Sequence, residues 1–212
     1  MKLTLVHLFF FAGLYRYRLG DIVRVTGFYN QSPQLAYVCR KNVVLTVHID
    51  KNTEKDLQIA VNEGMDKLRE HDPTIELVDF TSYASLSTDP GHYVIFVELN
   101  RLPHKNKLES VVIEENDAHR VNESIALLQE CATTIDLAFL DPGYVGSRKI
   151  HTIGSLELCL VKPGTFRSLL DRYLTRGAAI TQYKTPRCIP SDELRCILHS
   201  KVIASTHSTA YL

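Results

Sequence analysis

Residues Val43 to Pro73 carry the clearest pattern of secondary structure in the chain, and they read VVLTVHIDKNTEKDLQIAVNEGMDKLREHDP. Its start, residues 43–49, is rich in branched apolar side chains and predicts a strand. Thr53 suits a helix N-cap, because its hydroxyl can accept a hydrogen bond from a free backbone amide and carboxylates follow in the first turn. The apolar residues that follow predict a helix ending near residues 71–73, since they recur at helical spacing: Leu57, Val61, Met65 and Leu68.

The rest of the chain continues this alternation of strands and helices. Strand, helix, strand, strand, helix, strand is the split βαβ order of ferredoxin-like domains. We therefore expect an α/β (α+β) protein, in which a short β-hairpin precedes a ferredoxin-like βαββαβ domain. The later elements predicted are strands at 75–83 and 93–99 joined by a turn-rich segment at 85–91, a polar loop at 100–117, a helix at 119–139, a break at 141–143, a strand at 156–161, and a helix at 165–173 that Gly177 stops.

The chain before residue 46 reads as a different unit. Residues 13–45 contain short apolar runs on both sides of the turn-forming residues 30–33, which predicts a hairpin. A lone hairpin leaves open edges, so it should belong to a larger sheet. Residues 1–12 begin like a secretory leader, but they lack a cleavage site and are too short to span a bilayer. We expect 1–12 to be a non-native start, 13–45 the tail of one domain, and 46–212 a second domain.

The charge balance and the cysteines exclude several classes of function. Lys+Arg and Asp+Glu both number 24, so no net field draws the chain to nucleic acid or an anionic membrane. The five cysteines are scattered without zinc-type spacing and read as reduced, cytoplasmic thiols. The nine histidines show no catalytic triad or metal-ligand pattern. His92 and His151 read as strand or loop residues, and no metal site is expected.

A Gly-Asp pair with aromatic and cationic neighbours lies just before a predicted strand, in the stretch Tyr17, Arg18, Leu19, Gly20, Asp21. A glycine lets the backbone approach a ligand closely, and a neighbouring carboxylate can accept hydrogen bonds from both hydroxyls of a ribose. A solvated aspartate on a surface strand is the alternative.

Several further stretches stand in a fixed order along the chain: residues 13–30, VCRKNV at 38–43, IDKNTE at 49–54, PGHYVIF at 90–96, GSLEL at 154–158, GTF at 164–166 and QYKTPRC at 182–188. Together they make nearly the whole chain from residue 12 onward resemble the Gretchen Hagen 3 family of acyl acid amido synthetases.

The resemblance implies a ligase that uses ATP and Mg²⁺ to adenylate a plant hormone carboxylic acid, such as jasmonate, indole-3-acetate or a benzoate. An amino acid amine then attacks the acyl-adenylate. The implied partners are the small-molecule acid and the amino acid, with neither nucleic acid nor membrane.

The same resemblance implies roles for individual residues. The family's Tyr-Arg-x-Gly-Asp nucleotide motif matches residues 17–21, so Tyr17, Arg18, Gly20 and Asp21 would bind the nucleotide, with Asp21 on the ribose hydroxyls. Arg40, in Val-Cys-Arg, would also face the nucleotide.

Lys51 and Lys184 match lysines of a mobile carboxy-terminal domain that approach the phosphates. Negative charge develops there during adenylation, and an aimed cation stabilises it. We expect the hinge between residues 40–42 and residues 50–51. Solvated surface charges are the alternative reading of both lysines.

The chain departs from the family pattern before Gly13, where no Ser/Thr/Gly-rich phosphate loop is present. We therefore expect the 212 residues alone to be inactive and to need an amino-terminal domain. A non-catalytic ferredoxin-like binding module is the rival interpretation. The acid stays open, because residues 208–211 are closer to the jasmonate-conjugating branch, whereas residues 182–184 occur more in the auxin-conjugating branch.

Overall fold

The computed structural model describes residues 3–8, 17–40, 44–101, 118–175, 183–189 and 191–212. Of the predicted features, Gly177, Gln182 and most of the polar stretch 100–117 lie outside these residues. The strands are β1 (Leu3–Leu8), β2 (Tyr17–Tyr29), β3 (Ser32–Arg40), β4 (Val44–Leu45), β5 (Asn52–Thr53), β6 (Leu77–Ser85), β7 (His92–Leu99), β8 (Glu157–Val161) and β9 (Val202–His207). The helices are α1 (Glu54–His71), α2 (Ala118–Ala138), α3 (Pro142–Lys149), α4 (Thr165–Thr175) and α5 (Asp192–His199).

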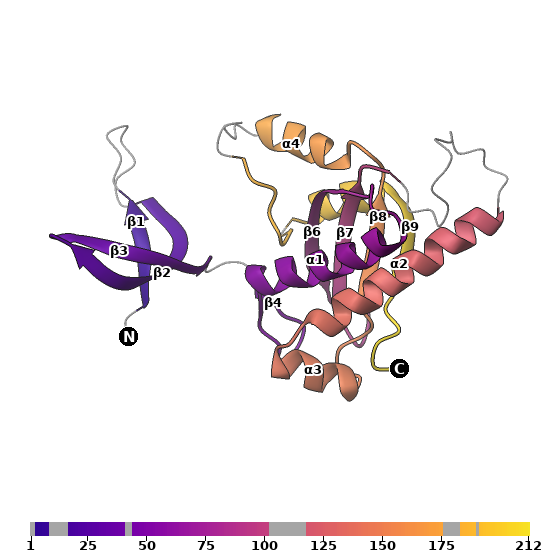
Figure 1. The fold of residues 1–212 in the computed structure, drawn as a ribbon, viewed down its shortest axis with the longest axis horizontal. Coiled ribbons are helices and arrows are strands. Elements are labelled where there is room, and N and C mark those ends of the chain that lie inside the picture. Colours follow the sequence, from indigo (N-terminus) through magenta and orange to yellow (C-terminus); the bar gives the residue numbers. More distant parts are fainter. Residues whose placement is uncertain (1–2, 9–16, 41–43, 102–117, 176–182, 190) are drawn as a thin grey trace.

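Strands β1, β2 and β3 form an antiparallel sheet beside the α/β body (Figure 1). The predicted hairpin is confirmed, and its turn consists of Asn30 and Gln31, with Asn30 in the left-handed region at φ 55°. Asparagine tolerates this conformation better than most residues. The first strand, β1, comes from residues 1–12 and covers the other edge of β2. The expectation that these residues are a non-native start stays a prediction.

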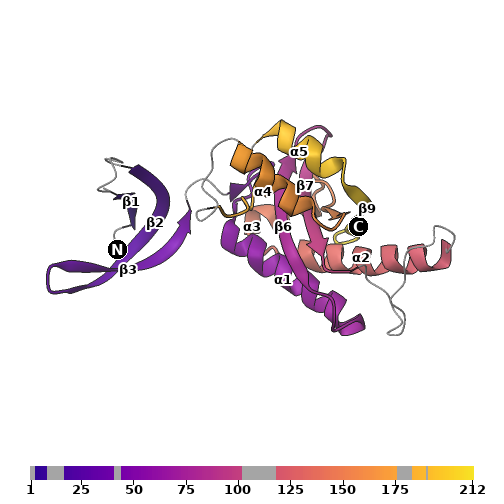
Figure 2. The ribbon, with the colours of Figure 1, turned by 90° about the horizontal axis from the view of Figure 1, so that it is seen from above.

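The α/β body is built on the four-stranded sheet β6-β7-β8-β9, in which only β7 and β8 run parallel. Helices cover both faces of this sheet (Figures 1 and 2). Helices α1 and α2 pack on one face around Leu57, Ile95 and Ile135, all fully buried. On the other face, α4 and α5 pack around Phe96 and Leu169. Strand β7 is buried along nearly its whole length, as a strand covered on both sides should be.

The predicted first strand, residues 43–49, is confirmed only at β4, and β4 pairs with β5 instead of entering the main sheet. The cause is Asp50, whose Oδ1 accepts hydrogen bonds from the amides of Val47 and His48 at 3.0 and 2.7 Å. Amides bonded to a side chain cannot pair with a neighbouring strand. The protein is therefore mixed α/β as expected, but the predicted βαββαβ order is wrong, because the strand predicted before α1 lies outside the main sheet and β9 supplies the fourth strand of that sheet.

Helix α1 begins and ends where the sequence predicts. Thr53 and Asp56 form a capping box, in which the Thr53 hydroxyl accepts from the Asp56 amide and the Asp56 carboxylate accepts from the Thr53 amide. Gly64 lies against α2, and a β-carbon there would come within 2.4 Å of Ile135 Cγ1. This glycine allows the two helices to pack closely.

The elements that were not predicted include β5, α3, α5 and β9. The stretch 141–143, expected to be a break, instead begins α3. Asp141 Oδ2 accepts a hydrogen bond from the Tyr144 amide at 2.9 Å, and Pro142 occupies the first helical position. Proline is well tolerated there because its missing N–H would have no partner in the helix.

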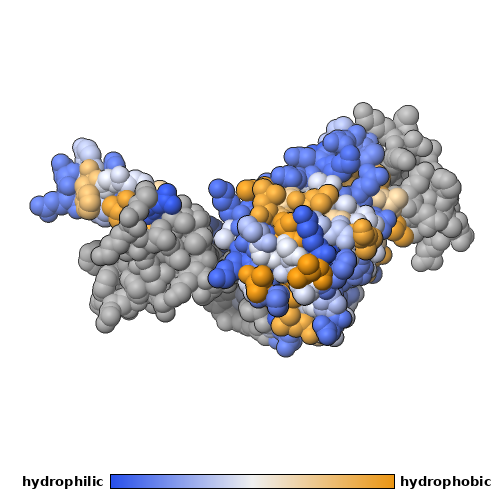
Figure 3. Space-filling view, turned by 90° about the horizontal axis from the view of Figure 1, so that it is seen from below, coloured by the Kyte–Doolittle hydropathy of each residue, from blue (hydrophilic) through white to orange (hydrophobic). Residues whose placement is uncertain are grey.

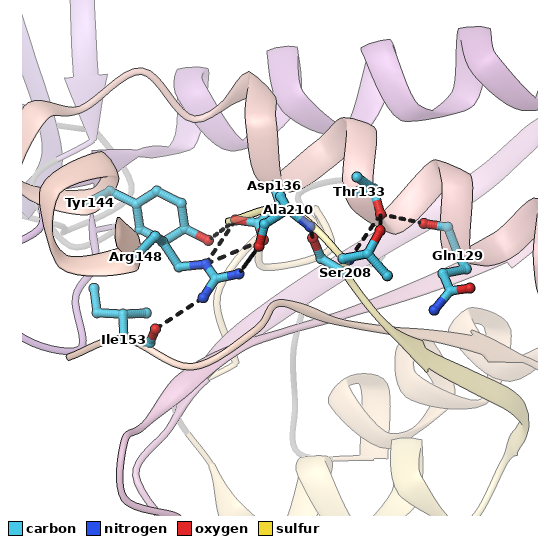
Figure 4. A network of polar contacts seen from close by, with 9 residues as sticks. Gln129, Thr133, Asp136, Tyr144, Arg148, Ile153, Ser208 and Ala210 are labelled. Carbon is cyan, nitrogen blue, oxygen red and sulfur yellow. Dashed lines mark hydrogen bonds and ion pairs between the residues drawn. The ribbon is translucent and has the colours of Figure 1, made fainter. Parts of the chain in front are cut away.

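A buried ion pair joins α2, α3 and the carboxy-terminal segment (Figure 4). Arg148 is 2% exposed and donates from Nη2 to Asp136 Oδ2 at 2.8 Å and to the Ala210 carbonyl at 2.9 Å. Its Nη1 donates to the Ile153 carbonyl at 3.1 Å, and the Tyr144 hydroxyl donates to Asp136 Oδ1 at 2.7 Å. Burial opposes the charge of Arg148, but Asp136 outweighs this effect and raises the guanidinium pKa. The guanidinium of Arg148 therefore stays charged inside the core.

Among the described residues, no helix combines the length and the apolar character needed to cross a bilayer. Seen from below, the α/β body exposes apolar residues scattered among hydrophilic ones (Figure 3). Large exposed apolar side chains of the protein include Ile49, Leu140 and Ile150.

Glu98 is expected to stabilise the start of α4. Its carboxylate accepts hydrogen bonds from the amides of Gly164 at 2.7 Å and Phe166 at 2.8 Å. Replacing Glu98 by alanine should lower the free energy of unfolding by about 2 kcal/mol, because the buried Phe166 amide loses its acceptor. Urea denaturation measures the change. Glu98→Gln, which keeps one acceptor oxygen, should lose less, and Glu76→Ala on the surface should change little. Equal losses for both Glu98 variants would contradict this role.

Candidate functional site

The Gly20–Asp21 pair lies at an irregularity of β2. On the β1 side, Leu5 pairs with Ile22 while His7 pairs with Arg18, so more residues of β2 than of β1 fall between these two pairs. On the β3 side the register also shifts, between Ile22 and Val23. Bulges of this kind are frequent beside binding sites, and a glycine accommodates them easily.

Backbone pairing brings Asp21 opposite Arg40. The two residues are register partners on the antiparallel strands β2 and β3, although the hairpin turn separates them in the sequence. Tyr17, Arg18 and Gly20 belong to the same strand, β2. The side chains of these residues lie outside what the structure describes, as do residues 41–43 of the hinge predicted between residues 40–42 and residues 50–51. The nucleotide-binding roles of this group therefore stay predictions.

The backbone of Lys51 is held between two buried residues, Asp50 and Asn52. The Tyr93 hydroxyl donates to Asp50 Oδ2 and lies 2.9 Å from Asn52 Nδ2, which donates to it. Burial is the main reason that the pKa of Tyr93 is raised, so the hydroxyl keeps its proton. The Lys51 amide donates to Asp141 Oδ2 at 3.3 Å. The main chain is thus fixed while the lysine side chain remains exposed.

Lys51 borders a surface pocket of about 270 Å³, which lies between α1 and the start of α3. Two carboxylates line it as well, but both are engaged in helix capping, Asp56 for α1 and Asp141 for α3. The other lining residues are apolar: Ile59, Ala138 and Leu140. Lys51 is the one lining side chain that carries a positive charge.

Lys184 is carried on a segment that pairs with the edge of β6. The Ser82 amide donates to the Arg187 carbonyl at 2.9 Å, and the Ile189 amide donates to the Ser82 carbonyl at 2.8 Å. Arg187 also binds Asp79 and lies over the Phe80 ring, with Cζ 4.1 Å from the ring centroid. These contacts fix the segment.

The Lys184 side chain itself is exposed, and within the part of the chain that is described no ion pair engages it. In both ribbon views the segment runs from the region of α4 toward the start of α1 (Figures 1 and 2). Lys51 precedes that helix.

Comparison with known proteins identifies the family. The model of the GH3 family C-terminal domain matches residues 55–193, more than half of the chain, and that of the GH3 family central domain matches residues 8–40. The chain belongs to the GH3 family. This confirms the resemblance found in the sequence.

Two curated GH3 relatives and one solved structure show what share of a GH3 protein's length this chain covers. It is 48% identical over 203 residues to the jasmonoyl–L-amino acid synthetase JAR4 of Nicotiana attenuata, covering 95% of this chain and 31% of JAR4. It is 40% identical over 201 residues to the indole-3-acetic acid-amido synthetase GH3.10 of Arabidopsis thaliana, covering 95% of this chain and 30% of the relative. The solved GH3.15 acyl acid amido synthetase superimposes with a TM-score of 0.73 at 40% identity, over 94% of this chain and 34% of that one. The GH3 chain thus spans about a third of the length of its relatives.

Proposed function

We propose that this GH3 chain is the carboxy-terminal part of an ATP-dependent acyl acid amido synthetase. In the proposed reaction, a hormone carboxylate attacks the α-phosphate of ATP and releases pyrophosphate, and an amino acid amine then attacks the acyl carbon and releases AMP. The observation that carries the proposal is the 48% identity to a jasmonoyl–L-amino acid synthetase over 95% of the chain. The lower identity, 40%, to an indole-3-acetic acid-amido synthetase favours jasmonate as the acid.

The roles proposed for the two parts of the chain follow the two family matches. Residues 13–45 would complete the adenylating domain, and residues 46–212 would form the mobile carboxy-terminal domain. The break between the matches, which end at residue 40 and resume at residue 55, supports a boundary there. Domain rotation at such a boundary could deliver Lys51 or Lys184 in one half-reaction and withdraw it in the next.

The described residues fit a polyphosphate ligand. Lys51 and Lys184 are both exposed. A cation of this kind stabilises the charge that develops on the α-phosphate and on the departing pyrophosphate. Asp21 and Arg40, opposite each other across β2 and β3, would hold the ribose and the phosphate side of the nucleotide.

Mg²⁺ would neutralise phosphate charge when bound. The carboxylates that line the pocket beside Lys51, Asp56 and Asp141, already accept hydrogen bonds from backbone amides of the helix starts. We therefore infer that these two residues would not hold the ion, and that the phosphates, several waters and carboxylates elsewhere in the complete enzyme would do so.

ATP–pyrophosphate exchange tests the proposal. The chain should be joined behind the preceding part of JAR4, so that it replaces the segment to which it is similar. This chimera should catalyse ATP–pyrophosphate exchange with jasmonate, and the exchange should be slower with indole-3-acetate. The chain by itself should catalyse no exchange with either acid. A folded chimera without exchange toward either acid would refute the proposal and favour a non-catalytic module.

Asp21 is expected to bind the ribose of ATP. In the active chimera, Asp21→Ala should raise the KM for ATP roughly 10- to 150-fold, because a hydrogen bond to a charged group contributes about 1.5 to 3 kcal/mol. Steady-state kinetics at saturating acid measure the effect. Asp21→Asn, which keeps one acceptor oxygen, should lose less. Asp171→Ala, on the exposed surface of α4, serves as the control. An unchanged KM for ATP would remove Asp21 from the site.

A further inference from the structure

Three side chains that could bind a metal meet at one end of the main sheet. His92 begins β7, Glu157 begins β8 and His207 ends β9. Glu157 and His207 are register partners, and β7 lies directly beside β8. One imidazole nitrogen from each histidine and one carboxylate oxygen lie within 4.8 Å of one another. Strand pairing therefore gathers residues that are far apart in the sequence.

Thr88 provides a hydrogen-bond acceptor for His92 Nδ1. Thr88 Oγ1 donates to the Pro90 carbonyl at 3.1 Å. The same oxygen lies 3.2 Å from His92 Nδ1 and can accept a hydrogen bond from an Nδ1–H group. With the proton on Nδ1, Nε2 presents a lone pair.

That lone pair faces another acceptor. His92 Nε2 is buried without a hydrogen-bond partner, and it lies 3.5 Å from Glu157 Oε2. A positive charge between the two atoms, either a proton on Nε2 or a metal ion, would make this contact favourable. The other oxygen, Glu157 Oε1, lies 3.5 Å from the Cys159 thiol, which donates to it. The carboxylate is therefore oriented with Oε2 toward the histidine.

The geometry suits Zn²⁺. Two ligand atoms about 2.1 Å from a tetrahedral zinc ion are roughly 3.4 Å apart. The 3.5 Å between His92 Nε2 and Glu157 Oε2 matches this separation. His207 is exposed on β9, so it can adjust toward the ion and leaves a path from solvent. Thr88 supplies the outer hydrogen bond that fixes a metal-binding imidazole.

We propose that His92, Glu157 and His207 form a binding site for Zn²⁺, with two nitrogen ligands, one oxygen ligand and an open position for water. The ion would connect β9 to β7 and β8 and so secure the edge of the sheet. This site is independent of the proposed amide synthesis, and its test requires no catalytic activity.

Calorimetric titration of the metal-free chain with ZnCl₂ tests the site. One ion should bind per chain, and the melting temperature should rise with free Zn²⁺. His92→Gln, Glu157→Gln and His207→Gln should each weaken binding more than about 100-fold, beyond the loss typical of outer-shell changes. Thr88→Ala touches no ligand atom of the ion, and it should weaken binding about 10- to 100-fold.

Matched controls separate a metal site from a polar cluster. His48→Gln and Thr175→Ala alter an exposed histidine and an exposed threonine that are not among the three proposed ligands, and both should bind Zn²⁺ like the unmodified chain. Circular dichroism without metal verifies that each variant is folded. The proposal is overturned if Zn²⁺ does not bind, or if binding survives all three ligand changes. It is also overturned if nitrogen NMR finds His92 Nε2 protonated in the presence of Zn²⁺, because a proton then occupies the gap.

Discussion

Replacing Asp136 by alanine is expected to lower the free energy of unfolding by about 3–5 kcal/mol, because Arg148 would stay charged in the core without its counter-ion. The loss should also release the Tyr144 hydroxyl, which donates to Asp136. Urea denaturation and thermal melting measure the effect, which should appear as a fall of roughly 6 to 20 °C in melting temperature.

Two comparisons show whether the buried charge is responsible. Asp66→Ala breaks an exposed pair with Arg69 on α1 and should change stability by less than about 1 kcal/mol. Removing both charges, as Asp136→Leu with Arg148→Met, should restore part of the stability that Asp136→Ala loses, because no buried charge then remains unpaired. A double variant that is less stable than Asp136→Ala would show that packing, not charge, dominates at this site.

Replacing Lys184 by alanine in the active chimera is expected to reduce kcat about 10²- to 10³-fold, the range seen when one group that stabilises transition-state charge is removed. The KM for the acid should change little, because the lysine acts on charge that develops only during phosphate transfer. Steady-state kinetics of amide formation measure both constants.

Control variants distinguish this role from a general effect of surface charge. Lys201→Ala removes an exposed lysine between α5 and β9 and should leave both constants unchanged. Lys184→Arg keeps the charge and should retain more activity than the alanine variant. If Lys184→Ala raises only the KM for the acid, the lysine binds substrate and does not act in the phosphate-transfer step.

The sequence predicted those elements whose local signals agree with their packing. Helix α1 has a capping residue, first-turn carboxylates and an apolar stripe, and its bounds were predicted closely. The strand predicted before it failed because Asp50 takes the amides of Val47 and His48. Helix α3 was missed although Asp141 and Pro142 are typical of a helix start. The same two residues also suit a turn, and we favoured the turn.

The residues of the candidate site were predicted from short sequence motifs, and the pairing of β2 with β3 brings two of them together. That Asp21 lies opposite Arg40 follows from the turn at Asn30 and Gln31 together with two register shifts, which apolar patterns do not reveal. The cluster of His92, Glu157 and His207 was missed for a related reason. It requires the strand order β7-β8-β9, and β9 itself was not predicted.

The contacts of Arg187 constrain how fast Lys184 could act. Its segment is joined to β6 through Ser82 and held to Asp79, so the lysine backbone moves with the sheet and not as a separate loop. Only its own side-chain torsions and a rotation of the entire body can change its distance from a bound nucleotide. Turnover would then depend on solvent viscosity, since a large body must diffuse through water at each cycle.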